Sequence, residues 1–548
     1  MRALVRQRRT GVRAGLAAAA ALSLAGAAFM PAGPAAADTD PPSGTPATVS
    51  ADPLPTAQVD GVVWSMATVG NTVYATGSFT KARPAGVAAG GAGEVDRGNI
   101  LAFDLTTGKL STSFVHTLDG QGLRIIASPD GSRVYVGGDF TKVDGKAHNH
   151  LAAFDTTTGA LIDSFAPNVH NRVRAIAATD STVYVGGNFF NVNGSGRTRL
   201  AAVKATDGSN IATWKPTADD DEVYALALYG DRVLVGGKFQ KLNGEAHVGI
   251  AAVSATNGGT LPWSSRPVPT KQSSTNFSYV TDLRVDDGIV YAGADGEGYH
   301  WFDGRFAAKA DTGDLVWLDN CYGATYGVYP VANEVYSVSH AHDCTSLGAF
   351  PDTNPQTNHR ALSETKAATG TDHGSPGTNS NYSRQPVPSL LHWFPKLAIG
   401  SFTKQYQAAW AVTGSGDYVA MGGEFPKVNG KAQQGLVRFA VKAKAPNKVG
   451  PESADLKAPT ASARLGGTVR VTWKTTWDMD NASLKYEVLR DGGTTPVGTL
   501  TRSAAFWNQA SLVYNDTSVP SGTHTYKIRV VDANGNTVTS AASNSVRR

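Results

Sequence analysis

The chain has 548 residues, too many for one ordinary hydrophobic core, so the sequence predicts at least two domains. It contains 60 glycines, and runs of Val, Tyr, Phe and Thr alternate with Gly, Asn and Asp turns, which argues against a helical fold and for an all-β chain. The formal net charge of +4 comes from five arginines before residue 38; the remaining 44 basic and 45 acidic residues argue against nucleic-acid binding.

Residues 1–37 have the pattern of a secretory signal peptide. Arginines precede the apolar run AGLAAAAALSLAGAAFM, and PAAA at 34–37 offers small residues for cleavage before Asp38. The run is rich in Ala and Gly and falls short of a good membrane span. We therefore expect a secreted, extracellular protein with a flexible N-terminus at 38–46 and no membrane span in the mature chain.

One line of sequence recurs along most of the chain. VYVGGDFTKVDG at 134–145 returns as VYVGGNFFNVNG at 183–194, VLVGGKFQKLNG at 233–244 and VAMGGEFPKVNG at 419–430, with a weaker copy, VYATGSFTKARP, at 73–84. Each copy reads as part of a four-stranded unit, with Asn-Gly and Asp-Gly forming tight turns. A period of roughly 40–50 residues per four strands is typical of β-propeller blades.

Two further markers follow each copy in a fixed order, a turn glycine and then an aromatic residue. We expect the aromatic residue to pack between adjacent blades, and the paired glycines to mark the close approach of neighbouring inner strands. The aromatic markers are Phe114, Phe165, Trp214, Trp263, Trp317 and Trp393.

The blade count follows from where the units begin. The seventh unit lacks a fourth strand, and residues about 47–54 match the junctions between units, so we expect them to supply that strand and remove the exposed edges. The sequence thus predicts a seven-bladed β-propeller over 47–445, although the stray IGSFTK at 399–404 leaves six or eight blades open. The units begin near Val62, Leu123, Val173, Val223, Tyr279, Val328 and Trp410.

The repeated line followed by AAFDTTTGALIDSFAP resembles the delta-60 repeat β-propeller family of bacterial exported proteins, which implies a propeller but no particular reaction. After a linker at 446–457, residues 458–548 resemble an immunoglobulin-like fibronectin type III sandwich. In that resemblance Trp473 is the core tryptophan, Tyr486 a partner and Tyr526 the tyrosine-corner residue. Such domains act as spacers or adhesion modules in bacterial exported proteins.

Cys321 and Cys344 are the only cysteines. In an oxidising compartment two cysteines usually pair, and closing this short loop stabilises a fold by about 3 kcal/mol in the chain-entropy picture. We therefore predict a disulfide.

The fifth and sixth units break the repeat, in AGADGEGYHWFDGRF at 292–306 and SVSHAHDCTSLGAFPDTNPQTNH at 337–359. Departures from a repeat that gather on one face indicate a binding surface. The aromatic residues there could stack on sugar rings or pack between blades. The candidate ligand-binding residues are Glu297, Tyr299, His300, Trp301, Asp303, His340, His342 and Asp343.

Two chemical hypotheses attach to this region. His340 and His342 alternate along a predicted strand and could ligate a metal with Asp343 or His300, although two histidines fall short of the usual three or four ligands. Glu297 with Asp295 or Asp303 could be an acid/base pair, or such acids could cap Gly-rich turns. We predict no cofactor.

We find no G-x-S-x-G elbow, H-E-x-x-H helix, P-loop or EF-hand loop, so the sequence favours binding over catalysis. The first hypothesis is a monomeric secreted protein that binds an extracellular or cell-wall glycan, or a surface protein, through the loop face of units five and six. The alternatives are a carbohydrate-active hydrolase or lyase at the same face, and a structural surface protein.

Overall fold

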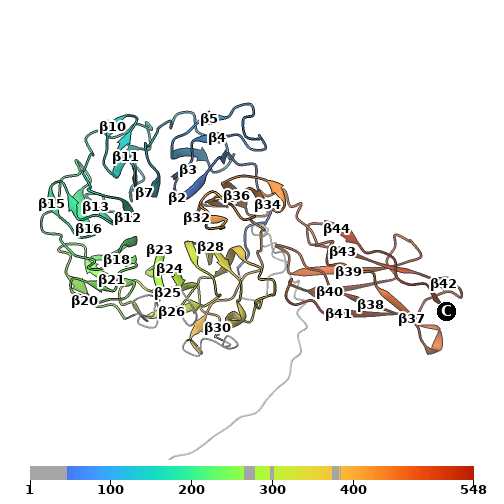
Figure 1. The fold of residues 1–548 in the computed structure, drawn as a ribbon. Coiled ribbons are helices and arrows are strands. Elements are labelled where there is room, and N and C mark those ends of the chain that lie inside the picture. The colour runs from blue at the N-terminus through green and yellow to red at the C-terminus, as the bar shows by residue number, and fades with distance from the viewer. Residues whose placement is uncertain (1–45, 265–277, 297–301, 373–381, 383) are drawn as a thin grey trace, which may run out of the picture. The chain divides into compact units, whose positions relative to one another are not determined.

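The computed structural model describes residues 46–264, 278–296, 302–372, 382 and 384–548, and this part of the chain is all-β, as predicted (Figure 1). The predicted signal peptide lies outside the described residues, as do 38–45 of the predicted flexible N-terminus. In the described part, no helix is both long and apolar enough to cross a membrane.

Within the described residues, seven antiparallel sheets follow one another along the chain, each with its strands hydrogen-bonded in chain order. Their strands are β2 (Val62–Val69), β3 (Thr72–Ser78) and β6 (Ile100–Asp104); β7 (Gly122–Ala127), β8 (Arg133–Gly138) and β11 (Leu151–Asp155); β12 (Val173–Ala178), β13 (Thr182–Gly187) and β16 (Leu200–Lys204); β17 (Val223–Tyr229), β18 (Arg232–Gly237), β21 (Ile250–Ser254) and β22 (Thr260–Leu261); β23 (Ser278–Asp286), β24 (Ile289–Gly296), β25 (Arg305–Lys309) and β26 (Leu315–Asp319); β27 (Thr325–Val331), β28 (Glu334–Ala341) and β29 (His359–Thr365); and β32 (Ala409–Ser415), β33 (Tyr418–Gly423) and β36 (Leu436–Ala440).

The first strands of these sheets lie against one another. Each contacts the first strand of the next sheet along the chain, and β32 of the last sheet also contacts β2 of the first. The chain order of the sheets is therefore also their order of contact.

The paired glycines end the second strands and let neighbouring strands come close. A Cβ on Gly186, the first of its pair, would lie 2.5 Å from Cγ1 of Val223 in the next sheet, and a Cβ on Gly187 would collide with the carbonyl oxygen of Arg172 on the paired strand. The first glycine thus makes room for the neighbouring sheet and the second for the neighbouring strand. The close approach expected from the sequence is confirmed.

The Asn-Gly turns have the predicted geometry. In the hairpin of β14 (Asn191–Val192) and β15 (Ser195–Gly196), Asn193 and Gly194 have φ angles of 51° and 75°, the positive values that this turn requires. Asp144, Asn243 and Asn429 repeat the conformation before their own glycines.

The aromatic markers connect neighbouring sheets. Trp214 packs edge-on against Tyr184 at 5.0 Å and donates its indole N–H to the carbonyl of Ser254 in the next sheet (2.9 Å). The predicted fourth strand around it is wrong: residues 210–216 make only the bridge from Asn210 to Val203. Pro216 lacks the N–H that a continuing ladder needs, and the segment instead places Trp214 in the core.

Residues 46–54 pair with the last strand of the seventh sheet, as expected. The backbone N–H groups of Ser50 and Leu54 donate to the carbonyls of Ala440 and Arg438, both at 2.8 Å. The buried guanidinium of Arg438 then donates to the carbonyls of Pro55 (2.5 Å) and Leu105 (2.6 Å). One side chain therefore ties the N-terminal segment, β36 and the loop after β6 together.

The C-terminal region forms two larger sheets around buried Trp473, Tyr486 and Tyr526, and a two-stranded one of β42 (Thr523–His524) and β45 (Val546–Arg547). The hydroxyl of Tyr526 donates to the Asp516 carboxylate (3.0 Å) rather than to a backbone group. The two larger sheets consist of β37 (Thr460–Ala463), β38 (Val469–Lys474) and β41 (Ser511–Asp516), and of β39 (Ser483–Arg490), β40 (Gly498–Ser503), β43 (Tyr526–Val531) and β44 (Thr537–Thr539).

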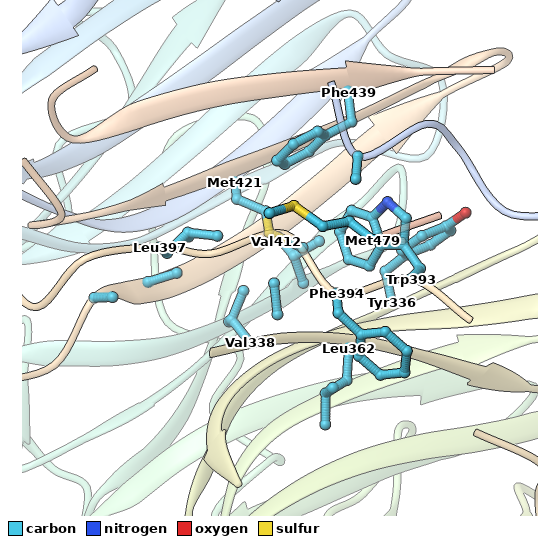
Figure 2. Packing of buried hydrophobic residues seen from close by; sticks show 14 of the residues in the cluster. Tyr336, Val338, Leu362, Trp393, Phe394, Leu397, Val412, Met421, Phe439 and Met479 are labelled. Atoms are coloured by element: carbon cyan, nitrogen blue, oxygen red, sulfur yellow. The ribbon is translucent and has the colours of Figure 1, made fainter. Parts of the chain in front are cut away.

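This region is bonded to the N-terminal segment. Asp480 accepts hydrogen bonds from the Ser50 hydroxyl (2.8 Å) and the Ala51 N–H (2.6 Å). Met479 belongs to the same buried cluster as Trp393, which packs edge-on against Tyr336 and Phe439 (Figure 2). The predicted linker is held as well, because Asp52 accepts from the N–H groups at 448 and 449.

Replacing Gly187 by Ala should lower the free energy of unfolding by about 1–3 kcal/mol, because the added methyl group meets backbone that cannot move aside. Urea denaturation measures the change. Gly196→Ala is the matched control, since nothing lies within 4 Å of the added carbon and its φ is not positive. Equal effects of the two substitutions would contradict the packing role of the glycine pair.

Candidate ligand-binding site

The first strand of each of the seven described sheets carries a β-bulge near its beginning. The register shifts by one residue between Val63 and Ser65, for example, so that Trp64 has no partner on β3. A bulge of this kind redirects a side chain. The residues so placed, called the bulge residues below, are Trp64, Leu123, Arg174, Tyr224, Thr281, Tyr326 and Trp410.

All the bulge residues line one cavity of about 280 Å³. Each is only partly buried, whereas the residues directly before it in the strands are buried. The volume lies near the lower end of the range of roughly 300–1,000 Å³ for small-molecule sites. The cavity is therefore the candidate site, and every sheet of the repeat region contributes to it.

Aromatic side chains form one wall of the cavity. The ring centroid of Trp410 lies 4.9 Å from that of Trp64 and 4.3 Å from that of Tyr326. Elsewhere in the cavity Tyr224 packs edge-on against Tyr279 at 5.6 Å, and the guanidinium of Arg174 lies 4.7 Å from the centroid of the Tyr224 ring. Apolar ring faces and a cation thus share a small space.

Polar residues of the second strands hold these aromatics. The Tyr279 hydroxyl donates to Asp295 (2.6 Å), the Tyr326 hydroxyl is bonded to Nδ1 of His340 (2.8 Å), and the Trp410 indole N–H donates to Glu424 (3.4 Å). The three partners occupy one repeat position, the x of GGxF. The residues at this position, called the x residues below, are Ser78, Asp139, Asn188, Lys238, Asp295, His340 and Glu424.

Three charged residues that line the cavity, Arg124, Asp282 and Arg284, form one layer of ion pairs. Asp282 forms ion pairs with Arg124 (2.8 Å) and Arg284 (3.5 Å). Burial alone would raise the pKa of Asp282, but the two arginines lower it overall, so the carboxylate is ionised. Arg174 is paired separately, with Glu222 at 3.4 Å.

Of the residues predicted from sequence, Asp295 lines the cavity and His340 lies directly behind one of its aromatic residues. Its Nδ1 is bonded to Tyr326, and its Nε2 accepts from the backbone N–H of Ala324 (3.3 Å). Burial lowers its pKa to about 4, and His342 and Arg360 act in the same direction, so the imidazole is neutral at physiological pH. His340 therefore positions an aromatic residue of the cavity.

His342 and Asp343 have different surroundings. The His342 ring stacks on Tyr322 and its Nδ1 lies 3.5 Å from a carboxylate oxygen of Asp352. Asp343 accepts from the N–H and hydroxyl of Thr345, which shapes the turn into η1 (Thr345–Leu347). Neither residue lines the cavity.

Asp303 is part of the loop framework. Its carboxylate accepts from the backbone N–H groups of Gly323 (3.0 Å) and Gly296 (3.3 Å). Burial and nearby Asp295 raise its pKa well above the ordinary value. The other predicted candidates, Glu297, Tyr299, His300 and Trp301, lie outside the described residues.

The predicted disulfide between Cys321 and Cys344 is confirmed, with a Cα–Cα distance of 4.2 Å. Of the residues described, one group of three potential metal ligands gathers, Asp319 with these two cysteines, and their thiolates are consumed by the bond. Both ring nitrogens of His340 already have protein partners. Metal binding by His340 and His342 stays a prediction.

The sequence reasoning missed the bulge residues. A signal was present, because the residue after the strand-opening valine changes from Trp64 to Arg174 to Tyr224 while its neighbours stay apolar and small. The x of GGxF varies in the same way. Positions that vary inside an otherwise constant repeat are those where the side chain can change without disturbing the fold, and a binding site can be built from them.

No protein-family model and no curated protein matches the chain. Among solved structures, it is similar to the computationally designed Ika8 protein (15% identity, TM-score 0.39, 71% of this chain and 99% of that chain) and to a chain of the Mitotic Checkpoint Complex (13%, 0.42, 73% and 96%). It is also similar to the extracellular domain of a putative one component system from B. thetaiotaomicron (9%, 0.37, 91% and 59%). With TM-scores below 0.5, these similarities support no inference.

The unfolding free energy should fall as the pH drops from about 6.5 to about 4, because over this range the unfolded chain binds a proton at His340 that the folded chain does not. Replacing His340 by Gln should remove on the order of 1–2 kcal/mol of the loss between pH 6.5 and 5. Urea denaturation at the two pH values measures it, with exposed His170→Gln as the control. The same pH dependence in both variants would contradict a neutral His340.

Proposed function

We propose that residues 47–445 form a seven-bladed β-propeller of the delta-60 repeat type, closed by the N-terminal segment, and that residues 458–548 form a fibronectin type III-like domain. Supporting this are the contact between β32 and β2 and the hydrogen bonds from Ser50 and Leu54 to the seventh sheet. On this proposal the bulge residues surround the propeller axis.

We propose further that the protein is secreted, as the leader pattern and the disulfide suggest, and that it binds an extracellular or cell-wall glycan in the cavity. The observation that carries the proposal is that the aromatic rings of Trp64, Trp410 and Tyr326 line the same cavity as hydrogen-bonding groups. A sugar ring has apolar C–H faces that stack on aromatic rings and a rim of hydroxyls that needs polar partners. On this proposal the binding site is the cavity lined by all seven units, and not the loop face of units five and six that the sequence suggests.

Glycan binding should depend on the aromatic wall. Trp410→Ala should weaken binding at least tenfold, about 1.4 kcal/mol, because it removes a stacking face and releases the partners Trp64 and Tyr326. A glycan array with the mature protein, followed by calorimetric titration of the best ligand, measures this.

The control is Tyr229→Ala, which removes an exposed tyrosine at the other end of β17. Unchanged affinity after Trp410→Ala, with the fold intact by circular dichroism, would place the ligand elsewhere. A glycan array on which the protein binds no glycan would count against glycan binding altogether.

A carbohydrate-active hydrolase or lyase is the second candidate, because Asp303 has a raised pKa beside Asp295, which lines the cavity. A carboxyl group with a raised pKa next to a second carboxyl group is a common arrangement for a general acid and its partner. The backbone bonds of Asp303 fit a loop anchor better. Release of reducing ends from a bound glycan, lost in Asp295→Asn, would favour the enzyme.

A further inference from the structure

The charged layer of the cavity contains more positive than negative charge. Arg124 and Arg284 share one carboxylate, that of Asp282. Arg124 is only 8% exposed and its Nε makes no hydrogen bond to the described residues, whereas the side chain of Arg284 is 28% exposed and its Nε faces Asp282 at 3.5 Å. Two guanidinium groups and one carboxylate carry an excess of one positive charge, and the burial of Arg124 makes this excess costly unless an anion joins it.

The two cavities that Arg124 and Arg284 line differ in what they offer an anion. One of about 230 Å³ has otherwise aliphatic lining, such as Ile126, Ile176 and Leu228. The aromatic cavity also has polar groups that accept and donate hydrogen bonds. An anionic group is therefore better stabilised in the aromatic cavity.

The other acids at the cavity have partners of their own. Glu222 is engaged with Arg174, and Asp295 accepts from the Tyr279 hydroxyl. Taken together, the three arginines of the cavity and the acids Asp282, Asp295 and Glu222 balance in charge. The excess positive charge is therefore local to the layer of Arg124, Arg284 and Asp282.

We propose that the glycan bound in the cavity is acidic, and that its single negatively charged group binds Arg124 and Arg284. This inference rests on the proposed glycan-binding function. A carboxylated sugar of the uronic acid type fits an excess of one charge, whereas a phosphate monoester carries about 1.5–2 negative charges at neutral pH. Arg presents a planar fork of N–H donors that matches a carboxylate.

The test compares each acidic oligosaccharide with its own neutral form. Uronic-acid oligosaccharides and the same oligosaccharides with their carboxyl groups reduced to hydroxymethyl groups are titrated into the mature protein by calorimetry. We expect the acidic form to bind at least tenfold more tightly than the reduced form, and Arg124→Gln to abolish that preference. Exposed Arg502→Gln is the matched control.

Leu123→Glu provides a second variant, because Leu123 is a bulge residue of the same cavity next to Arg124 in the chain. A carboxylate built into the protein should take the place of the ligand's anion, so the variant should lose the acidic ligand more than the reduced one. This keeps the test decisive where Arg124→Gln fails to fold.

Equal affinity for the acidic and reduced forms would overturn the inference and leave glycan binding standing. Binding of neither form would overturn both proposals. Oligosaccharides that carry sulfate esters are titrated as well. If these bind more tightly than their neutral forms and the carboxylated ones do not, the assignment of a carboxylate is wrong.

Discussion

The contact between a glycine of one sheet and a valine of the next is the constraint on which the rest of the repeat region depends. Gly186 faces Val223 and Gly236 faces Val280, so the second strand of one sheet approaches the first strand of the next more closely than any side chain larger than hydrogen would allow. The residue after each of these valines is a bulge residue. Holding the sheets together and lining the cavity are therefore tasks of adjacent positions on one strand.

The difference between positions that hold the sheets together and positions that line the cavity explains how much of the molecule could be predicted from sequence. Glycines, turn residues and core aromatics recur because backbone geometry demands them, so the all-β fold, the Asn-Gly turns and the pairing of residues 46–54 with β36 could be anticipated. The bulges could not, because they arise from register between strands and leave no propensity signal. His340 was noticed as a histidine with a neighbour two residues away, but its role comes from Tyr326 across the strand pair.

The C-terminal sheets also differ from the simple expectation of a spacer on a linker. Asp480 accepts two hydrogen bonds from the segment that pairs with β36, and Met479 is buried with Trp393 (Figure 2). The sequence does not reveal these contacts, because Asp480 and Met479 lie outside the repeat, where no other copy shows the same junction. Burial raises the pKa of Asp480 and of Asp478, so acidic groups here sit where charge is expensive.

The pairing of residues 46–54 with β36 has a consequence for how the chain matures. The hydrogen bond from Arg438 to Thr56 joins residues 382 positions apart, and contacts of such long range form late and slowly during folding. The earliest-made segment must wait, with its strand edge unpaired, until almost all of the repeat region has been synthesised. A chain cut short before β36 would therefore leave this segment without its partner strand.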